Sequence, residues 1–447
     1  MAQTAVSSAG IFSSAQSRSD GMQQLAWRLY LLSITTSFLV VIEPALCDLI
    51  FMIGLVVFGF SRPKTTSFLS GAATTGVLLY LIFSVISLFF VQYNPIGAYR
   101  AVLIEFYMIG LFVMTAYYAR TRGDEAFRAI LLALVIGGVL ASIVTVVALL
   151  DLIPNSDIFY RGEGVRNRVK ATFKDPNVFG PFLVPSILFV TWILVESKRY
   201  RFLALGVLGM LLISLVSTFS RGAWVHALFS LMVMAGALLA LRSTSRAVFS
   251  IILYLAIAIC LVVLLFLDRI VAGLADTFFA DRLSLQSYDT TRFAFVADAT
   301  VQILRHPLGI GPVQARFVYG YLPHNTFIAF AMHNGIFACI GLILIYGSSL
   351  FRCATKVMDQ RPGWTKYALI LSVLMGLLVL MMVVGAIHWR HMYVVCGLAF
   401  GVYASDRALP EGRLWPRKQV LPTRSRPTGL IVNRPNQANH IGHWSEH

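Results

Sequence analysis

The sequence predicts an all-α polytopic membrane protein, and three observations support this fold class. Hydrophobic residues make up 58% of the 447 residues and charged residues only 13%, and the mean hydropathy is +0.76. Apolar runs of about 20 residues, the length that one bilayer crossing requires, recur along the chain. Arg and Lys gather in alternate loops between these runs, as the positive-inside rule expects of cytoplasmic loops. A lipid bilayer is therefore the first expected partner.

Apolar runs bounded by charged or turn residues predict about twelve membrane-spanning helices. The expected spans are 26–43, 45–61, 68–91, 99–119, 126–150, 176–196, 201–218, 222–241, 247–267, 325–351, 365–386 and 391–404. Residues 1–25 carry no short apolar core followed by a cleavage site, and we expect a retained cytoplasmic tail. Residues 405–447 mix basic residues with Pro and polar residues, which predicts a disordered basic cytoplasmic tail. Residues 26–404 would then form the transmembrane domain, with both termini cytoplasmic.

Two predicted outer loops carry basic residues against this orientation rule. The rest of the +16 net charge lies mainly in inner loops and tails, where orientation and anionic lipid account for it, so nucleic acid is not an expected partner. The first outer loop spans about 151–175, and the second and largest spans about 268–324. The first contains a cluster of basic residues: Arg161, Arg166, Arg168 and Lys170. These side chains either pair with carboxylates such as Asp175 or form an anion site, because guanidinium forks suit phosphate oxygens.

Further polar residues stand at predicted outer helix ends. Arg221, in "STFSRGAWVHA", lies between the seventh and eighth spans, where an arginine either snorkels to headgroups or joins the basic loop. His324 and Asn325 lie where the large outer loop enters a span, and a polar pair there either caps the helix or serves chemistry. Within this loop, apolar residues recur at three- and four-residue intervals over 291–304, which predicts an amphipathic helix lying along the interface.

Four motifs together resemble a known family. "GVRNRVKATFKDPNVFGPFLV", "FSRGAW", "TRFAFVADATVQILRHPLGIGP" and "PHNTFIAFAMHNGIFACIG" follow one another over about 150–345. This order resembles the O-antigen ligase and O-antigen polymerase superfamily of bacterial membrane glycosyltransferases. The resemblance implies a GT-C-type fold in the bacterial inner membrane, with the active site facing the periplasm. It also implies transfer of a glycan from undecaprenyl diphosphate to a sugar hydroxyl of a lipid A core or a growing polysaccharide, without a metal or other cofactor.

The resemblance assigns roles to particular residues. It implies that His324 is the catalytic group near the acceptor and that arginines bind the diphosphate. The implied diphosphate contacts are Arg221 and one of Arg161, Arg166 and Arg168, with Lys170 in the same stretch. Beside the resemblance, we expect Asn325 to orient His324 or cap the helix within the substrate site, and Arg390 to be a further contact to the lipid diphosphate or the glycan. The chemistry agrees, because fixed guanidiniums stabilise a diphosphate leaving group more in the transition state than in the ground state. A neutral imidazole can accept the acceptor's proton.

Several alternatives stay open at this point. Glu43, at the first outer turn, is a rival base to His324. His333 occupies a position where family members commonly have an acidic residue, and it is either a hydrogen-bonding substitute or a packing residue. His388 and His391 have H-x-x-H spacing, but no nearby Cys or carboxylate completes a metal set, so no metal site is expected.

Other functions compete with the ligase. A polysaccharide polymerase of the same superfamily shares the donor chemistry and differs in its acceptor. A transporter or flippase would also explain about twelve helices, but transporters usually show internal repeats and broken helices at the midplane. A non-catalytic scaffold would leave the outer arginines and His324 without a shared target.

Overall fold

The computed structural model describes residues 2–42, 44–61, 68–161, 168–197, 199–242, 287–360 and 363–401. The described chain is helical, with an isolated β-bridge between Tyr160 and Val169. The α-helices are α1 Ala2–Thr35, α2 Leu46–Phe60, α3 Gly71–Ser87, α4 Pro95–Arg122, α5 Asp124–Leu149, α6 Pro176–Glu196, α7 Arg201–Ser217, α8 Arg221–Arg242, α12 Ser287–Arg305, α13 Gln314–Tyr319, α14 Thr326–Asn334, α15 Ile336–Met358, α16 Trp364–Met381 and α17 Arg390–Leu398. Short 3-10 helices are η1 Thr36–Phe38, η2 Leu88–Phe90 and η3 Ser156–Phe159.

Seven of the described helices are long and apolar enough to cross a membrane. They are α3 continued by η2, α4, α5, α6, α8, α15 and α16, and α2 and α7 are shorter apolar helices. The described part of the chain therefore has the composition of a polytopic membrane protein. The predicted span 247–267 and the predicted tail 405–447 lie outside the described residues, as does the loop segment 268–286.

Three expected elements differ in extent from the helices of the structure. Helix α1 begins at Ala2, so residues of the predicted 1–25 tail continue the first span as helix. The last expected span, 391–404, overlaps the nine-residue helix α17, which begins one residue earlier. The expected span 325–351 is two helices, α14 and α15, which part at Gly335.

The break at Gly335 arises because another segment bonds to the backbone there. Residues 306–311 run past it, and the Ile310 and Gly311 amides donate to the carbonyls of Met332 and His333, each at 3.0 Å. Gly335 has φ of +89°, and a Cβ on it would lie 2.7 Å from the Leu308 carbonyl carbon. A side chain cannot fit in that space, so glycine is required at this break.

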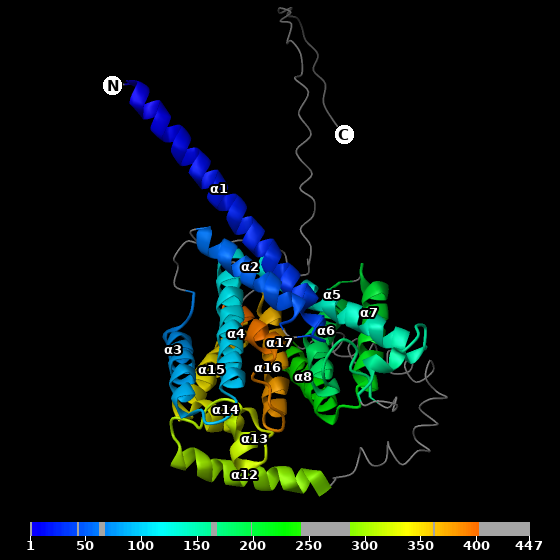
Figure 1. Ribbon diagram of the computed structural model, residues 1–447. Coiled ribbons are helices and arrows are strands. Elements are labelled where there is room, and N and C mark those ends of the chain that lie inside the picture. Colours follow the sequence, from blue (N-terminus) through cyan, green and yellow to red (C-terminus); the bar gives the residue numbers. More distant parts are fainter. Residues whose placement is uncertain are drawn as a thin grey trace, which may run out of the picture.

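Long helices such as α3, α4 and α16 stand side by side, and α12 crosses one end of the bundle nearly at right angles to them (Figure 1). Helix α12 confirms the helix predicted over 291–304. The contact between α3 and α15 depends on small residues: a Cβ on Gly76 would lie 2.8 Å from the Gly341 carbonyl oxygen. Close backbone approach of this kind commonly favours helix association in lipid. Burial of apolar side chains contributes little there, because lipid tails already surround them.

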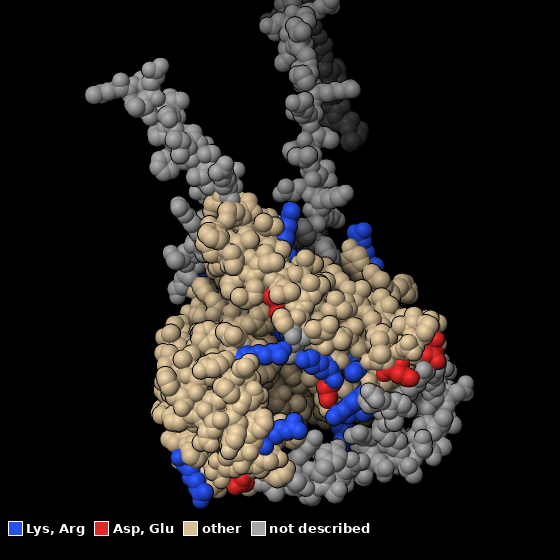
Figure 2. Space-filling model, viewed as in Figure 1, with Lys and Arg blue, Asp and Glu red and all other residues tan. Residues whose placement is uncertain are grey.

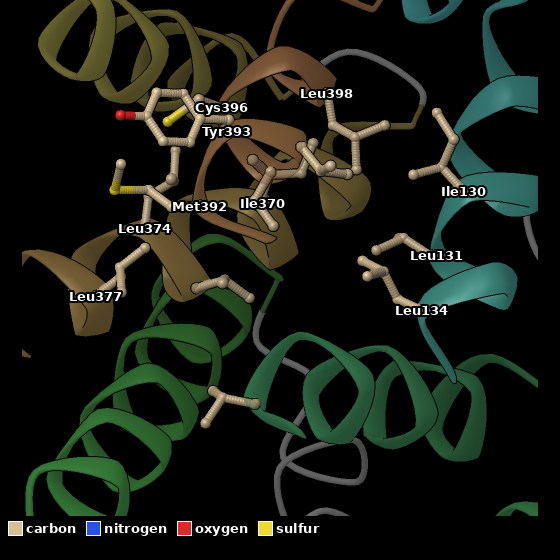
Figure 3. Close-up of a cluster of buried hydrophobic side chains, with 14 of the residues drawn as sticks. Ile130, Leu131, Leu134, Ile370, Leu374, Leu377, Met392, Tyr393, Cys396 and Leu398 are labelled. Carbon is tan, nitrogen blue, oxygen red and sulfur yellow. The ribbon is translucent and has the colours of Figure 1, made fainter. Parts of the chain in front are cut away.

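The interior between α5, α16 and α17 is filled by aliphatic side chains. Ile130 and Leu134 of α5 face Ile370 of α16 and Leu398 of α17 (Figure 3), and all four are at most 2% exposed. Since so little of their surface is left open, these helices form one packed core rather than a lumen.

Contacts sort the predicted inner and outer loops to opposite ends of the bundle. At one end, Lys366 forms an ion pair with Asp124, both from predicted inner segments. At the other end, the Thr172 hydroxyl donates to the Phe38 carbonyl, and buried Gln314 donates from Nε2 to the Tyr93 carbonyl at 2.6 Å. Thr172 belongs to the predicted outer loop 151–175 and Gln314 to the predicted outer loop 268–324. We call this second end the loop end.

Candidate functional site at the loop end

Arg168 connects the loop between α5 and α6 to the turn between α7 and α8. Its side chain is 5% exposed, and Nε donates to the Thr218 carbonyl at 3.1 Å while Nη2 donates to Asn177 Oδ1 at 2.8 Å. Ser220 Oγ donates to the same Asn177 oxygen at 2.9 Å. One amide oxygen therefore joins the loop, the α6 start and the α7–α8 turn.

The other basic residues of this loop are placed differently. Arg161 is about half exposed, and its Nη1 lies 3.3 Å from Asp175 Oδ2, which is the pairing that the sequence left as an alternative. The Asp175 carboxylate also caps α6 by accepting the Asn177 amide at 2.7 Å. Lys170 is half-buried, and Arg166 lies outside the described residues.

Arg221 is the first residue of α8 and is half-buried. The turn before it is tight, with Phe219 at φ of +46°, and the Ser220 hydroxyl accepts the Ala223 amide at 3.4 Å. At the next position, a Cβ on Gly222 would lie 2.6 Å from Leu380 Cδ1. The start of α8 thus packs against the end of α16, and this contact fixes the position of Arg221.

His324 and Asn325 lie at the start of α14. His324 is exposed, in the bend before the helix. Asn325 caps the helix, because its Oδ1 accepts the amides of Phe327 and Ile328 at 3.0 and 3.1 Å. Its Nδ2 donates to the Met382 carbonyl at 3.1 Å. Both ends of the Asn325 amide are therefore used to hold the helix start that carries His324.

The segment 380–386, at the end of α16, contacts both sides of this site. The Thr326 hydroxyl donates to the Val384 carbonyl at 2.5 Å and accepts the Ala386 amide at 3.0 Å, while Leu380 packs against Gly222. The segments carrying Arg221 and His324 are therefore neighbours of one common element. On the face shown in Figure 2 the surface is hollowed above the α12 region, and Lys and Arg side chains gather around the hollow.

Arg390 forms a bidentate ion pair with Asp48. Nε and Nη2 each lie 2.8 Å from one carboxylate oxygen, and both side chains are 16% exposed. The guanidinium also lies over the Tyr107 ring, 5.7 Å from its centroid. Asp48 itself caps α2 by accepting the Ala45 amide at 2.8 Å. One edge of the Arg390 guanidinium, which was predicted to contact substrate, is thus paired with Asp48. This ion pair joins α17 to α2.

Of the two histidines near the last span, His391 is a packing residue and His388 is exposed. His391 is 3% exposed and stacks on Trp389 with ring centroids 5.5 Å apart. Trp389 is itself buried, at 5% exposed. His333 is half-buried at the α14–α15 break. Among the residues that the structure covers, no three His, Cys, Asp or Glu side chains group as metal ligands would. The rival base Glu43 is not a described residue.

Aromatic residues attach α12 to the segment that precedes His324. The Tyr321 ring stacks on Phe295 with centroids 4.5 Å apart, and its hydroxyl donates to Asp298 Oδ2 at 2.5 Å. Burial and this carboxylate raise the pKa of Tyr321, so it stays a donor at neutral pH. Tyr321 lies three residues before His324, and its contacts limit where that histidine can lie.

Three side chains of the site region were not foreseen from the sequence. Asp48 and Glu105 are single carboxylates within apolar runs, and an isolated acid in such a run is itself a signal of a paired or functional group. Asn177 follows Asp175 and Pro176 at the start of a span, where only a cap is indicated by sequence. Its role as the partner of Arg168 depends on a contact between distant segments.

The chain has no match among protein-family models and none among curated protein sequences. The site is therefore interpreted from its own residues and from the motif resemblance.

Proposed function

We propose that the chain is an O-antigen ligase-like glycosyltransferase of the bacterial inner membrane, with cytoplasmic termini and a periplasmic loop end. It would transfer a glycan from undecaprenyl diphosphate to a sugar hydroxyl during synthesis of lipopolysaccharide or exopolysaccharide. The observation that carries the proposal is the placement of Arg168, Arg221 and His324. Their segments, from three different outer loops, lie at one end of the bundle and are joined through Asn177 and the 380–386 segment.

The reaction breaks the bond between the anomeric carbon and a phosphate oxygen and forms a bond from that carbon to the acceptor oxygen. Negative charge grows on the departing diphosphate, and Arg221 is the half-buried cation that would stabilise it. His324, exposed at the same end, would take the proton that the acceptor hydroxyl loses. The diphosphate leaves attached to its lipid, and the guanidinium of Arg221 would offset part of the charge that it gains.

Arg168 and Asn325 would serve chiefly to hold these two groups. Arg168 bonds the carbonyl of Thr218, three residues before Arg221, and Asn325 caps the helix that begins directly after His324. In this role Arg168 still adds positive potential near the diphosphate, because a guanidinium stays charged at any physiological pH.

The experiment compares surface polysaccharide with lipid-linked precursor in cells that carry His324→Ala or Arg221→Ala. Both variants are expected to lose product and accumulate precursor at an unchanged protein level. His306→Ala and Arg305→Ala are matched controls, since both are exposed residues at the end of α12, and we expect normal product from them. Normal product from His324→Ala and Arg221→Ala would refute the proposal.

A polymerase of the same superfamily would give the same donor phenotype, and the two are separated by the product. A single repeat unit still transferred to the acceptor, with loss of polymer length, indicates a polymerase, whereas full-length polymer that remains on the lipid carrier indicates a ligase. A transporter or flippase is the second candidate, favoured by one observation: Glu105 is a buried carboxylate beside the α14–α15 break. In that case the precursor would accumulate on the cytoplasmic face.

A further inference from the structure

Glu105 is an acid enclosed by the helical bundle. It lies on α4, about 15 Å along the axis from Pro95, where the helix begins, at 1.5 Å per residue. Its side chain is 3% exposed. None of the ion pairs found between described residues includes it. The neighbours of Glu105 must therefore account for its stability without a countercharge.

Those neighbours are neutral hydrogen-bonding groups. Asn334 Nδ2 donates to Glu105 Oε2 at 2.7 Å and to Ser84 Oγ at 2.8 Å, and the Ser84 hydroxyl also bonds the Glu105 carboxyl. Ser84 and Asn334 are at most 1% exposed. The three side chains come from α3, α4 and the end of α14, so they form a closed ring between helices.

Titratable groups that face Glu105 are tyrosines. Tyr80 of α3 and Tyr393 of α17 interact with it electrostatically, and their hydroxyls are 3.0 Å apart. The third helix packed on α4, α5, contributes no interacting charged group among the described residues. Both tyrosines are neutral, so neither supplies a positive charge that would stabilise an ionised Glu105.

A bare carboxylate in such surroundings costs several kcal/mol, because neutral donors replace water only in part. The neutral acid avoids this cost and still uses the ring: one oxygen accepts from Asn334, and the O–H donates to Ser84. We propose that Glu105, Ser84 and Asn334 form a proton-binding site inside the bundle, in which the Glu105 carboxyl carries the proton. This proposal is independent of the glycosyltransferase assignment.

The site is also tied to the break between α14 and α15. Asn334 is the last residue of α14, directly before Gly335. When Glu105 loses its proton, the charge remains enclosed, and its donors among the described residues are the neutral Asn334 amide and Ser84 hydroxyl, so the helix break is strained or must admit water. The proton thus stabilises the position of the α14 end, which the 306–311 segment also contacts.

The test uses Glu105→Gln in the full chain, purified in detergent micelles. The Gln amide reproduces the neutral acid, because its oxygen accepts from Asn334 and its NH₂ donates to Ser84. We expect the Tm of the variant to match the natural chain within about 2 °C at pH about 4, and to exceed it by about 3 °C or more at pH about 9. The sign follows because an unfolded glutamate loses its proton above about pH 4.3 while the enclosed one keeps it, so raising the pH favours unfolding of the natural chain and not of the variant. Glu125→Gln, an exposed acid, is the control, with no pH-dependent difference expected.

Two outcomes would overturn the proposal. One is an equal loss of Tm in Glu105→Gln at both pH values, or failure of the variant to fold, since either means that the carboxylate charge is required. The other is a higher Tm of the natural chain in sodium chloride than in choline chloride that Glu105→Gln abolishes, since this would identify a bound sodium ion instead of a proton.

Discussion

The ion pair between Asp48 and Arg390 allows a quantitative test of what holds α17 against α2. Asp48→Asn keeps the size of the side chain and removes its charge, leaving the Arg390 guanidinium 16% exposed and without its carboxylate. Removing one partner of a buried pair costs about 3–5 kcal/mol. Because both side chains retain some exposure, and Asn can still accept one hydrogen bond, we expect the lower limit, about 3 kcal/mol.

The assay is denaturant unfolding of the purified protein in micelles, with a double-mutant cycle. Arg390→Gln alone should cost a similar amount, and the double variant Asp48→Asn, Arg390→Gln should cost less than the sum by about 2 kcal/mol. The control is Glu125→Gln, which breaks the exposed pair with Arg122 and should cost less than about 0.5 kcal/mol. Additive losses, or an Asp48→Asn loss no larger than the control, would refute the reasoning. Lost activity at unchanged stability would instead restore Arg390 as a substrate contact.

Two further predictions concern the site and the helix break. Arg168→Ala should lower the free energy of unfolding by about 2–4 kcal/mol, since two charge-assisted hydrogen bonds are lost, whereas Arg161→Ala should cost less than about 1 kcal/mol because its pair is half exposed. Equal losses in the same unfolding assay would contradict this contrast. Gly335→Ala should cost about 2–5 kcal/mol, because the new Cβ meets the Leu308 backbone at a positive φ. Gly347→Ala, in the same region of chain but with open space around it, should cost nothing, and similar thermal shifts for both would count against the strain.

Part of the fold could be predicted because hydropathy and charge act locally. Each of the seven long apolar helices overlaps a predicted span, and α12 covers the helix predicted over 291–304. The prediction of a single span over 325–351 was wrong. The residues on both sides of the break are apolar, so hydropathy does not reveal where one helix ends and the next begins. The break at Gly335 is made by backbone hydrogen bonds from residues 306–311, which no average over the run itself can detect.

The candidate site shows the same division. The basic loop, Arg221 and His324 could be singled out because charges at predicted helix ends need a partner. Which partner each has could not be read from the sequence. Arg390 was expected to contact substrate, yet Asp48, more than three hundred positions earlier in the chain, takes one edge of its guanidinium. Arg168 likewise bonds Asn177 and the Thr218 carbonyl.

The sequence by itself determined that this protein is helical and suited to a bilayer, and that loops such as 151–175 are basic, because apolar length and charge position are properties of continuous segments. Only the tertiary structure decided which of those polar groups meet. Hydrogen bonds and ion pairs act over about 3 Å, so they depend on how distant helices are packed. Asn325, for example, caps its own helix and also bonds Met382, and Glu105 is enclosed with Ser84 and Asn334.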